Sequence, residues 1–425
     1  MINDYKKFNR ILNVFEAMLE YLVSIAAGTV YLAKITDYLG MSDEITAVLS
    51  AFVSLGCGFQ VLSVFYRVDK NVKKFITAGY VINQLLFTFL YVLPLIPVAN
   101  AAKCVMLIIA LFSAQIILNV VSSPRTFVFM SFVGDDMRGK FTALKEMVSL
   151  AFGIVFSLLI GTVTDKFTAN GNERGAFLTC AVIMAVITVL HTLTLVFIKN
   201  PQSVVPPENE PRVKIGELLK DKSLWKVIAV TSLWAAANYA TLSFSGTYMN
   251  NELNFSLTFS SAIIVAGSVL RMAFSFPLGK LADKKGFSYM MTAALFIAAA
   301  GYLAGAFSVP KNGRILYPAF YALYSVAMAG INSATMNLIY DYVSPRHRAG
   351  ALALNQSVSG ICGFLTTVLL TPVMRAVKNG GNSFFGLTIY SQQIFAALSL
   401  IISLLCALFI KLNLKTRTNA NEMLR

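Results

Sequence analysis

Twelve long apolar stretches follow one another along this chain, and they constrain its fold more than any other feature. Each has the roughly 20 mostly apolar residues that a helix needs to cross a bilayer. No alternation with a period of two runs through them, which argues against a transmembrane β-barrel. The stretches fall at about 11–33, 43–66, 75–97, 104–133, 141–164, 175–198, 223–248, 256–278, 287–309, 315–340, 350–373 and 385–411.

The composition excludes a soluble protein with one membrane anchor. Hydrophobic residues make up 57% of the chain and charged residues only 13%, whereas a soluble domain has about 25% charged residues. The deficit extends along the whole length. Because a helix satisfies its own backbone hydrogen bonds inside lipid, the sequence predicts an all-α membrane protein with twelve transmembrane helices.

One long polar segment, 199–222, lies between the sixth and seventh apolar stretches. It predicts a six-helix bundle at 1–198, a central loop with a short amphipathic helix at 199–222, a second six-helix bundle at 223–412, and a tail at 413–425. Parallel six-helix halves with a substrate site between them are typical of transporters.

The two halves share an internal repeat. The segment VGDDMRGKFTALKEMVS at 133–149 aligns with VSPRHRAGALALNQSVS at 343–359, so that Arg138 corresponds to Arg348. This correspondence indicates that the two predicted bundles are pseudo-symmetric copies.

Basic residues predict the orientation. If both termini are cytoplasmic, 24 of the 35 Lys and Arg residues lie on the inner side of the membrane. The positive-inside rule therefore predicts a multi-pass protein of the cell membrane with both ends in the cytoplasm. The basic residues are divided among short loops, so the net charge of +15 gives no indication of nucleic-acid binding.

Two loop motifs resemble a known family. The segment GKLADKKGFS, Gly279 to Ser288, is similar to the G-x-L-a-D-r-x-G-r-k signature of the major facilitator superfamily, and YDYVSPRHRAG at 340–350 resembles that family's second recurrent inner loop. With twelve spans and a central loop, the resemblance covers essentially the whole chain. It implies the major facilitator fold, alternating access, and transport of a small molecule without a cofactor.

The resemblance also implies a gate at the inner loops. It assigns Gly279, Asp283, Lys284 and Gly286 to the gating loop, in which the glycines allow a tight turn and Asp283 forms an electrostatic latch. Arg138 and Arg348 belong to the corresponding loops of the two halves. In the first half the aspartate position holds Val68, and Asp69 follows it, so a contact of Asp69 is expected to replace the latch.

Ionisable residues lie deep inside the predicted membrane spans. Arg125 is ten residues from Asp135 and Glu20 is ten residues from Arg10, so both lie roughly 15 Å deep. Arg271, nine residues from Lys280, lies at a similar depth. An isolated charge in lipid is costly, so these groups are expected to pair around an interior, water-accessible space. Lys145 and Glu146 lie somewhat shallower.

Glu16, Glu20 and Arg125 form the predicted proton-coupling site. Glu16 and Glu20 share one helix face, and two carboxylates in a low dielectric repel each other, so one of them can hold a proton near neutral pH. The alternative is a permanent salt bridge that only positions the helices. Pro124 predicts a bend beside the charge. His191, alone in an apolar run, is predicted to be structural.

In the family, helices 1, 4, 7 and 10 line the central cavity. Amides and aromatic rings on these helices suit a hydroxylated solute, although such groups also form hydrogen bonds between packed helices. The candidate substrate-binding residues, which include Arg271 of helix 8, are Asn13, Glu16, Glu20, Gln115, Asn119, Arg125, Trp234, Asn238, Tyr239, Arg271, Tyr324 and Asn332.

The sequence contains no phosphate-binding loop, catalytic triad or metal-ligand cluster, so we expect a transporter and not an enzyme. The favoured hypothesis is a monomeric symporter that couples protons, or another cation, to a polar solute such as a sugar or an organic anion. One alternative is a drug/proton antiporter, although the segment LAFGIVFSLLIGTV at 150–163 lacks the proline of the exporter motif. Another is a transporter-like sensor that does not transport.

Overall fold

The computed structural model describes residues 2–64, 72–130, 132–133, 138–199, 215–344, 347–384 and 387–414. The chain forms two compact units. One comprises Met1–Pro211 together with Ser256–Ala262, and the other comprises Arg212–Phe255 and Ile263–Arg425. The division differs from the predicted domain limits mainly at 256–262, the start of a helix, which groups with the first unit.

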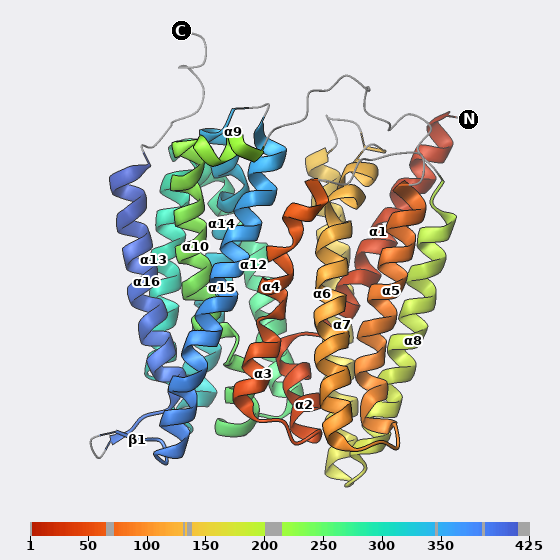
Figure 1. Ribbon diagram of the computed structural model, residues 1–425, viewed down its shortest axis with the longest axis vertical. Coiled ribbons are helices and arrows are strands. Elements are labelled where there is room, and N and C mark those ends of the chain that lie inside the picture. The colour runs from red at the N-terminus through yellow and green to blue at the C-terminus, as the bar shows by residue number, and fades with distance from the viewer. Residues whose placement is uncertain are drawn as a thin grey trace. The chain divides into compact units, whose positions relative to one another are not determined.

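Long helices make up the first unit, with two short 3₁₀ turns, η1 at Gln60–Val64 and η2 at Leu93–Leu95 (Figure 1). Its helices are α1 Ile2–Ala26, α2 Thr29–Tyr38, α3 Asp43–Ser50, α4 Phe52–Gly58, α5 Val72–Val92, α6 Asn100–Met130, α7 Arg138–Ala169 and α8 Glu173–Phe197.

The first predicted span is not one straight helix. It consists of the segments Lys6–Ala26 and Thr29–Tyr38, which meet at a bend of 45°. Gly28 precedes α2, and a Cβ at this position would lie 2.8 Å from the carbonyl oxygen of Ile25. Only glycine accommodates so close an approach to the backbone, and this explains why the bend occurs here.

Helix α1 packs against α7 and α8, and α5 packs against α6 and α8. Apolar side chains from α5, α6 and α8, and from the residues just after α6 and α8, form one core cluster, which includes Ile76, Val121 and Phe132. Asn9 on α1 binds the end of α8 through both of its amide atoms. Its Nδ2 donates to the Lys199 carbonyl, and its Oδ1 accepts from the Lys199 amide, at 3.0 Å each.

The 256–262 segment is attached to the first unit by polar contacts. The Asp165 carboxylate on α7 accepts hydrogen bonds from the backbone amides of Leu257 and Thr258, at 3.0 and 2.8 Å. A carboxylate at the first turn of a helix satisfies free amides and interacts favourably with the helix dipole. The Tyr31 hydroxyl lies 2.8 Å from the Ser261 hydroxyl.

The second unit is also helical. Its elements are α9 Ile215–Lys220, α10 Lys222–Leu242, α11 Ser245–Thr247, the π-helical turn η4 Tyr248–Glu252, α12 Leu257–Lys285, α13 Phe287–Ala306, α14 Gly313–Tyr342, α15 Arg348–Asn379, strands β1 Ser383–Phe384 and β2 Leu387–Thr388, and α16 Ser391–Asn413. Helix α13 packs on α14 and α16, and α10 packs on α15 and α16.

Several spans differ from their predicted limits. The predicted span 256–278 continues to Lys285, and the predicted span 350–373 continues to Asn379, because helices extend past the apolar core with charged ends. The last span begins at Ser391 and not at 385. Gly381 and Asn382 adopt φ angles of 67° and 55°, which turn the chain into a short antiparallel strand pair before it.

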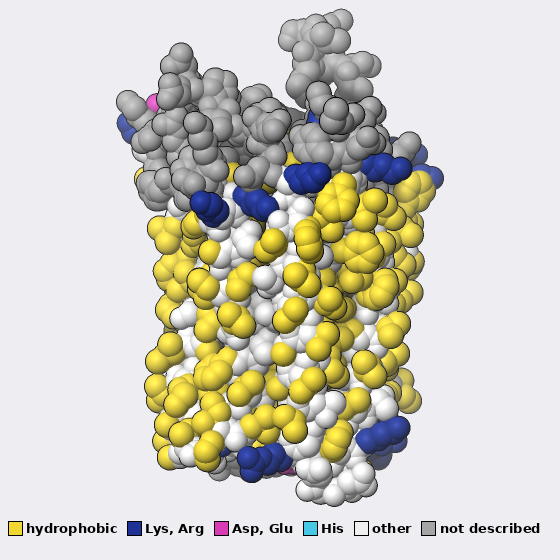
Figure 2. Space-filling model, turned by 90° about the vertical axis from the view of Figure 1, so that its right-hand side faces the viewer, with side chains coloured by type: hydrophobic (Ala, Val, Ile, Leu, Met, Phe, Trp, Pro, Cys, Tyr) yellow, Lys and Arg dark blue, Asp and Glu magenta, His cyan; other side chains and the backbone are white. Residues whose placement is uncertain are grey.

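The helices have the dimensions and surface of membrane spans. Among the described residues, eleven helices are long and apolar enough to cross a bilayer, and the bent pair brings the number to twelve. On the face shown in Figure 2, hydrophobic side chains cover the middle, and Lys and Arg side chains gather at both ends. This distribution is expected for a surface that contacts lipid tails between two headgroup layers.

Candidate functional site: a buried charge cluster

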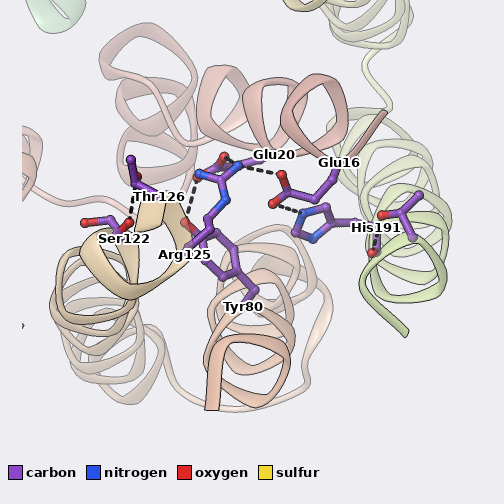
Figure 3. Close-up of polar contacts among 8 residues, drawn as sticks. Glu16, Glu20, Tyr80, Ser122, Arg125, Thr126 and His191 are labelled. Atoms are coloured by element: carbon purple, nitrogen blue, oxygen red, sulfur yellow. Dashed lines mark hydrogen bonds and ion pairs between the residues drawn. The ribbon is translucent and has the colours of Figure 1, made fainter. Parts of the chain in front are cut away.

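Two carboxylates and one arginine meet in the interior of the first unit. Glu16 and Glu20 lie one turn apart on α1, and Arg125 reaches them from α6 (Figure 3). The Arg125 Nη2 atom lies 2.7 Å from Oε2 of Glu16, and Arg125 also forms an ion pair with Glu20. The exposed fractions of the side chains are 12% for Arg125, 0% for Glu16 and 21% for Glu20. Protein atoms therefore surround most of the Arg125 side chain.

Aromatic rings complete the environment of Arg125. Its guanidinium carbon lies 4.9 Å from the ring centre of Tyr80 and 5.4 Å from that of Phe129. Cation–π contacts of this kind stabilise a desolvated guanidinium. The Tyr80 hydroxyl on α5 donates a hydrogen bond of 3.2 Å to Oε1 of Glu20. The α6 helix continues through Pro124 to Met130, so the proline does not end the helix beside the cluster.

His191 on α8 joins the cluster from the side opposite Arg125. Its Nε2 atom lies 3.3 Å from Oε1 of Glu16, and its side chain has no exposed surface. Its ring also packs edge-on against Tyr80, with centroids 5.8 Å apart. Sequence reasoning treated His191 as an isolated structural residue and did not single out Tyr80. The structure shows that His191 is not isolated, because it directly contacts a predicted proton-coupling carboxylate, whereas its structural role stays a prediction.

Each of the four carboxylate oxygens has a partner, and Arg125 serves two of them. Glu16 uses Oε2 for Arg125 and Oε1 for His191, whereas Glu20 uses Oε2 for Arg125 and Oε1 for the Tyr80 hydroxyl. Lys145, half-buried on α7, interacts electrostatically with both carboxylates and with Arg125. Because burial removes water, these partners carry the stabilisation of the charges.

Three polar candidates of the first unit lie outside this set of contacts. Asn13 on α1 is fully buried, and neither of its side-chain polar atoms has a hydrogen-bond partner among the described residues. Gln115 is buried on α6, where its carbonyl accepts a hydrogen bond of 2.9 Å from the Asn119 amide. Gln115 and Asn119 both pack against Gly56 of α4. The cavity role of these residues stays a prediction.

In the second unit, three of the predicted residues form a polar aromatic cluster. The Tyr324 hydroxyl on α14 donates a hydrogen bond of 2.7 Å to Oδ1 of Asn238 on α10. The rings of Trp234 and Tyr324 are stacked, with centroids 6.5 Å apart and planes at 18°. Arg271, half-buried on α12, interacts electrostatically with Tyr324. Both rings are buried, with exposed fractions of 6% for Trp234 and 9% for Tyr324, so contact of this cluster with a solute stays a prediction.

The remaining two candidates of the second unit differ in their environments. Tyr239 contributes its backbone carbonyl, which accepts a hydrogen bond of 3.2 Å from the Thr367 hydroxyl. The Asn332 side chain is exposed, and its carbonyl accepts a hydrogen bond of 3.0 Å from Thr335. The structure therefore does not bring Asn332 into the Trp234–Tyr324 cluster.

The gating loop is shorter than predicted. Gly286, with a φ of 85°, makes the turn between α12 and α13, as only glycine does readily. Gly279 lies inside α12, so the expectation that it forms the turn was wrong. The helix continues through Gly279 to Lys285, and only the glycine that follows it leaves helical geometry. Asp283 and Lys284 are exposed at the end of α12.

The other loop residues have varied positions. Arg348 begins α15, where its Nη2 donates a hydrogen bond of 2.9 Å to the Tyr340 carbonyl and its guanidinium lies 4.9 Å from the Tyr340 ring centre. Arg138 begins α7, but its side chain lies outside the described part of the chain. Asp69 also lies outside the described residues, so the replacement latch stays a prediction.

Solved structures of transporters share this architecture, although no curated protein sequence matches the chain. A mutant form of the nucleoside transporter NupG aligns at 15% identity with a TM-score of 0.72, covering 96% of this chain and 100% of that one. A bacterial homologue of the human lysosomal transporter Spinster aligns at 14% identity with a TM-score of 0.71, covering 96% of each chain.

A D-xylose-proton symporter aligns at 12% identity with a TM-score of 0.66, covering 94% of this chain and 96% of that one. At such identities these likenesses show the fold alone, which is two six-helix bundles. The family model for the Major Facilitator Superfamily matches residues 13–367. A match over most of the chain identifies a multi-pass membrane transporter and not an enzyme. The chain belongs to the Major Facilitator Superfamily.

Proposed function

We propose that this protein is a proton-coupled symporter for a small polar organic solute, acting as a monomer in the cytoplasmic membrane with both termini inside. The observation that supports this most strongly is the cluster of Glu16, Glu20 and Arg125, in which one arginine serves two carboxylates. A proton on one carboxylate removes its negative charge and so weakens one of the two ion pairs of Arg125. Such a release can favour one state of a two-state transporter over the other.

The proton is expected to exchange at the partly exposed side of the cluster. Glu20 retains 21% exposed surface, whereas Glu16 has none. Proton movement needs contact with water or a polar path. The D-xylose-proton symporter among the similar folds supports proton coupling only as an analogy between proteins of one family.

The solute is expected to contain a ring and hydroxyl groups. The stacked pair Trp234 and Tyr324 covers apolar ring faces, and Asn238 beside it offers an amide. Sugars and nucleosides combine these features, and similar folds include transporters named for each. The basic residue Arg271 near Tyr324 keeps an organic anion among the candidates.

Transport in proteoliposomes tests the proposal. Purified protein is first screened by thermal shift against pentoses, hexoses, nucleosides and dicarboxylates, since a ligand of the folded state raises the melting temperature. Uptake of radiolabelled D-xylose, uridine and succinate is then measured with an imposed pH gradient. We expect accumulation of a stabilising compound only when the outside is more acidic.

A matched pair of variants identifies the coupling carboxylate. We expect Glu20→Gln to abolish the response of uptake to the pH gradient, because the neutral amide cannot exchange a proton. Glu146→Gln changes the same chemical group on the exposed surface of α7 and should leave the response intact. Accumulation only against an opposing proton gradient would instead indicate the antiporter, and ligand binding without any flux would indicate the sensor.

Tyr324→Phe tests the solute site. The substitution removes the hydroxyl that donates to Asn238 but keeps the ring stacked on Trp234. We expect the KM of uptake to rise about tenfold, as one polar contact is lost, with a smaller change in the maximal rate. Tyr289→Phe, which alters an exposed tyrosine on α13, is the control. An unchanged KM in Tyr324→Phe would remove this cluster from the solute site.

A further inference from the structure

His191 gives the two carboxylates of the cluster different tasks. We propose that His191 is a positioning residue. As a neutral imidazole with its proton on Nε2, it donates to Glu16 and keeps that group a permanent carboxylate, so that Glu20 alone exchanges the coupled proton. The role of Glu20 rests on the proposed function, because a coupled proton requires proton-driven transport. The protonation state of His191 can be tested without measuring transport.

The contacts of Glu16 support the first half of the inference. Its side chain has no exposed surface, and its two oxygens face two different donors, Arg125 at 2.7 Å and His191 at 3.3 Å. A proton on Oε2 would face a guanidinium that has only donors to offer. A fully buried carboxylate that accepts two such bonds is held in its charged form. Glu16 is therefore an anchor for Arg125 and not a site of proton exchange.

The geometry also selects the tautomer of His191. If the ring carried its only proton on Nδ1, the Nε2 lone pair would face the Glu16 oxygen across 3.3 Å of dry interior. Nδ1 is itself buried and has no hydrogen-bond partner among the described residues. A proton on Nδ1 would have no acceptor among the described residues, whereas a proton on Nε2 can be donated to the Glu16 carboxylate.

The surroundings of the ring favour the neutral imidazole. Glu16 faces His191 from α1, and Tyr80 contacts the ring from α5. Arg125 on α6 already satisfies the other oxygen of Glu16, and Lys145 on α7 adds a further positive charge near the cluster. A charged ring would also carry a proton on Nδ1, which is buried and has no hydrogen-bond partner among the described residues. A buried donor without an acceptor is costly, so the neutral ring is favoured.

Glu20 differs from Glu16 in its partners and exposure. It has 21% exposed surface, and its second oxygen accepts from a phenol, the Tyr80 hydroxyl, where Glu16 has an imidazole. A phenol can also accept a hydrogen bond, so a protonated Glu20 could reverse the bond and donate to Tyr80. Glu20 can therefore take up a proton without leaving an unpaired donor, whereas Glu16 cannot.

Nuclear magnetic resonance of the histidine ring tests the tautomer directly. The chain has only two histidines, so His347→Gln leaves His191 as the single signal in ¹⁵N-histidine-labelled protein. At about pH 7.5 we expect one protonated and one unprotonated ring nitrogen, with the proton on Nε2. A doubly protonated ring at about pH 7.5, or a proton on Nδ1, would overturn the inference.

Thermal stability as a function of pH tests the positioning role. His191→Gln keeps an N–H group for Glu16, whereas His191→Leu fills the space and removes the donor. We expect Gln to retain the parent melting temperature within about 2 °C. Leu should lower it by about 5 °C at about pH 8, where the charged Glu16 lacks its second donor. The loss should be less than half as large at about pH 5, because Glu16 of this variant, without the donor that holds it charged, can take up a proton. A loss in Leu that does not depend on pH would reduce His191 to a packing residue.

The two proposals fail separately. If Glu20→Gln leaves the pH-driven uptake of D-xylose or uridine intact, proton coupling at Glu20 is wrong, but the ring tautomer and the pH dependence of His191→Leu remain as measured. If uptake is coupled and depends on Glu20, yet His191 is charged at neutral pH, the symporter stands and the positioning role of His191 is wrong.

Discussion

At the scale of single residues, Arg125 is the centre of the molecule's buried chemistry. It holds Glu16 and Glu20 and is flanked by the rings of Tyr80 and Phe129. Its depth and that of Glu20 can be counted from the charged ends of their helices, so their pairing could be predicted. The contact of a histidine on α8 could not, because it depends on how α1 and α8 align, and one histidine in an apolar run carries no sign of its partner.

Removing the arginine should damage folding more than the lost contact area implies. Arg125→Ala leaves Glu16 buried without its strongest partner, and breaking one side of a buried ion pair costs about 3–5 kcal/mol. Arg125→Lys keeps the charge but loses the planar fork that serves two carboxylates, so we expect an intermediate stability. Melting of both variants in detergent checks the order. If Arg125→Ala melts with the parent protein, the cluster does not stabilise the fold.

At the scale of elements, close helix packing explains features that hydropathy does not reveal. Apolar length predicts where spans lie, and this part of the fold was readable from the sequence. The bend at Gly28 could not be predicted, because a glycine within an apolar run does not reveal whether the helix bends there. The role of Gly279 was also misread: its motif suggested a turn, but α12 continues through it, and Gly286 alone turns the chain.

Gly56 offers a test of packing between α4 and α6. A Cβ at this position would lie 2.8 Å from Nδ2 of Asn119 and 2.9 Å from the carbonyl oxygen of Gln115. We expect Gly56→Ala to destabilise the protein by about 1–3 kcal/mol through overpacking. Gly279→Ala is the matched control, since nothing lies within 4 Å of its Cβ position and alanine favours a helix interior by about 1 kcal/mol. Equal melting temperatures of the two variants would contradict this account.

The contact of Asp165 with the first turn of α12 makes a second prediction at this scale. Asp165→Ala removes the acceptor for the amides of Leu257 and Thr258, and the loss of such a cap costs about 1 kcal/mol. Asp165→Asn keeps an acceptor oxygen and should lose less. Hydrogen exchange of the peptide that contains Leu257 and Thr258 reports the result, with faster exchange expected in the alanine variant. Unchanged exchange there would show that water caps the helix equally well.

At the scale of the whole molecule, charge distribution and family membership agree on a membrane transporter. Basic side chains gather at both ends of the surface in Figure 2, with apolar side chains between them. Composition and the twelve apolar stretches were sufficient to predict this architecture, because lipid allows a chain few alternatives. The solute could not be predicted from the sequence, because amides and aromatic rings contribute to helix packing as well as to ligand binding.

The orientation can be tested on the whole chain. We expect a fluorescent protein fused after Arg425 to fluoresce and an alkaline phosphatase fused there to be inactive, because the tail is predicted to be cytoplasmic. Fusions truncated after Lys311, in the predicted outer loop between α13 and α14, should show the reverse. Phosphatase activity at the C-terminal fusion would invert the topology and with it the predicted direction of transport.

The hydrogen bonds that join Asn9 to Lys199 have a mechanical consequence. They clamp α1 to the end of α8, about two turns from the level at which Glu16 meets His191. We therefore expect α1 and α8 to move together as one rigid pair. A rearrangement of the cluster during the transport cycle is then expected to move Arg125, on α6, relative to α1 and α8, with both carboxylates staying on α1.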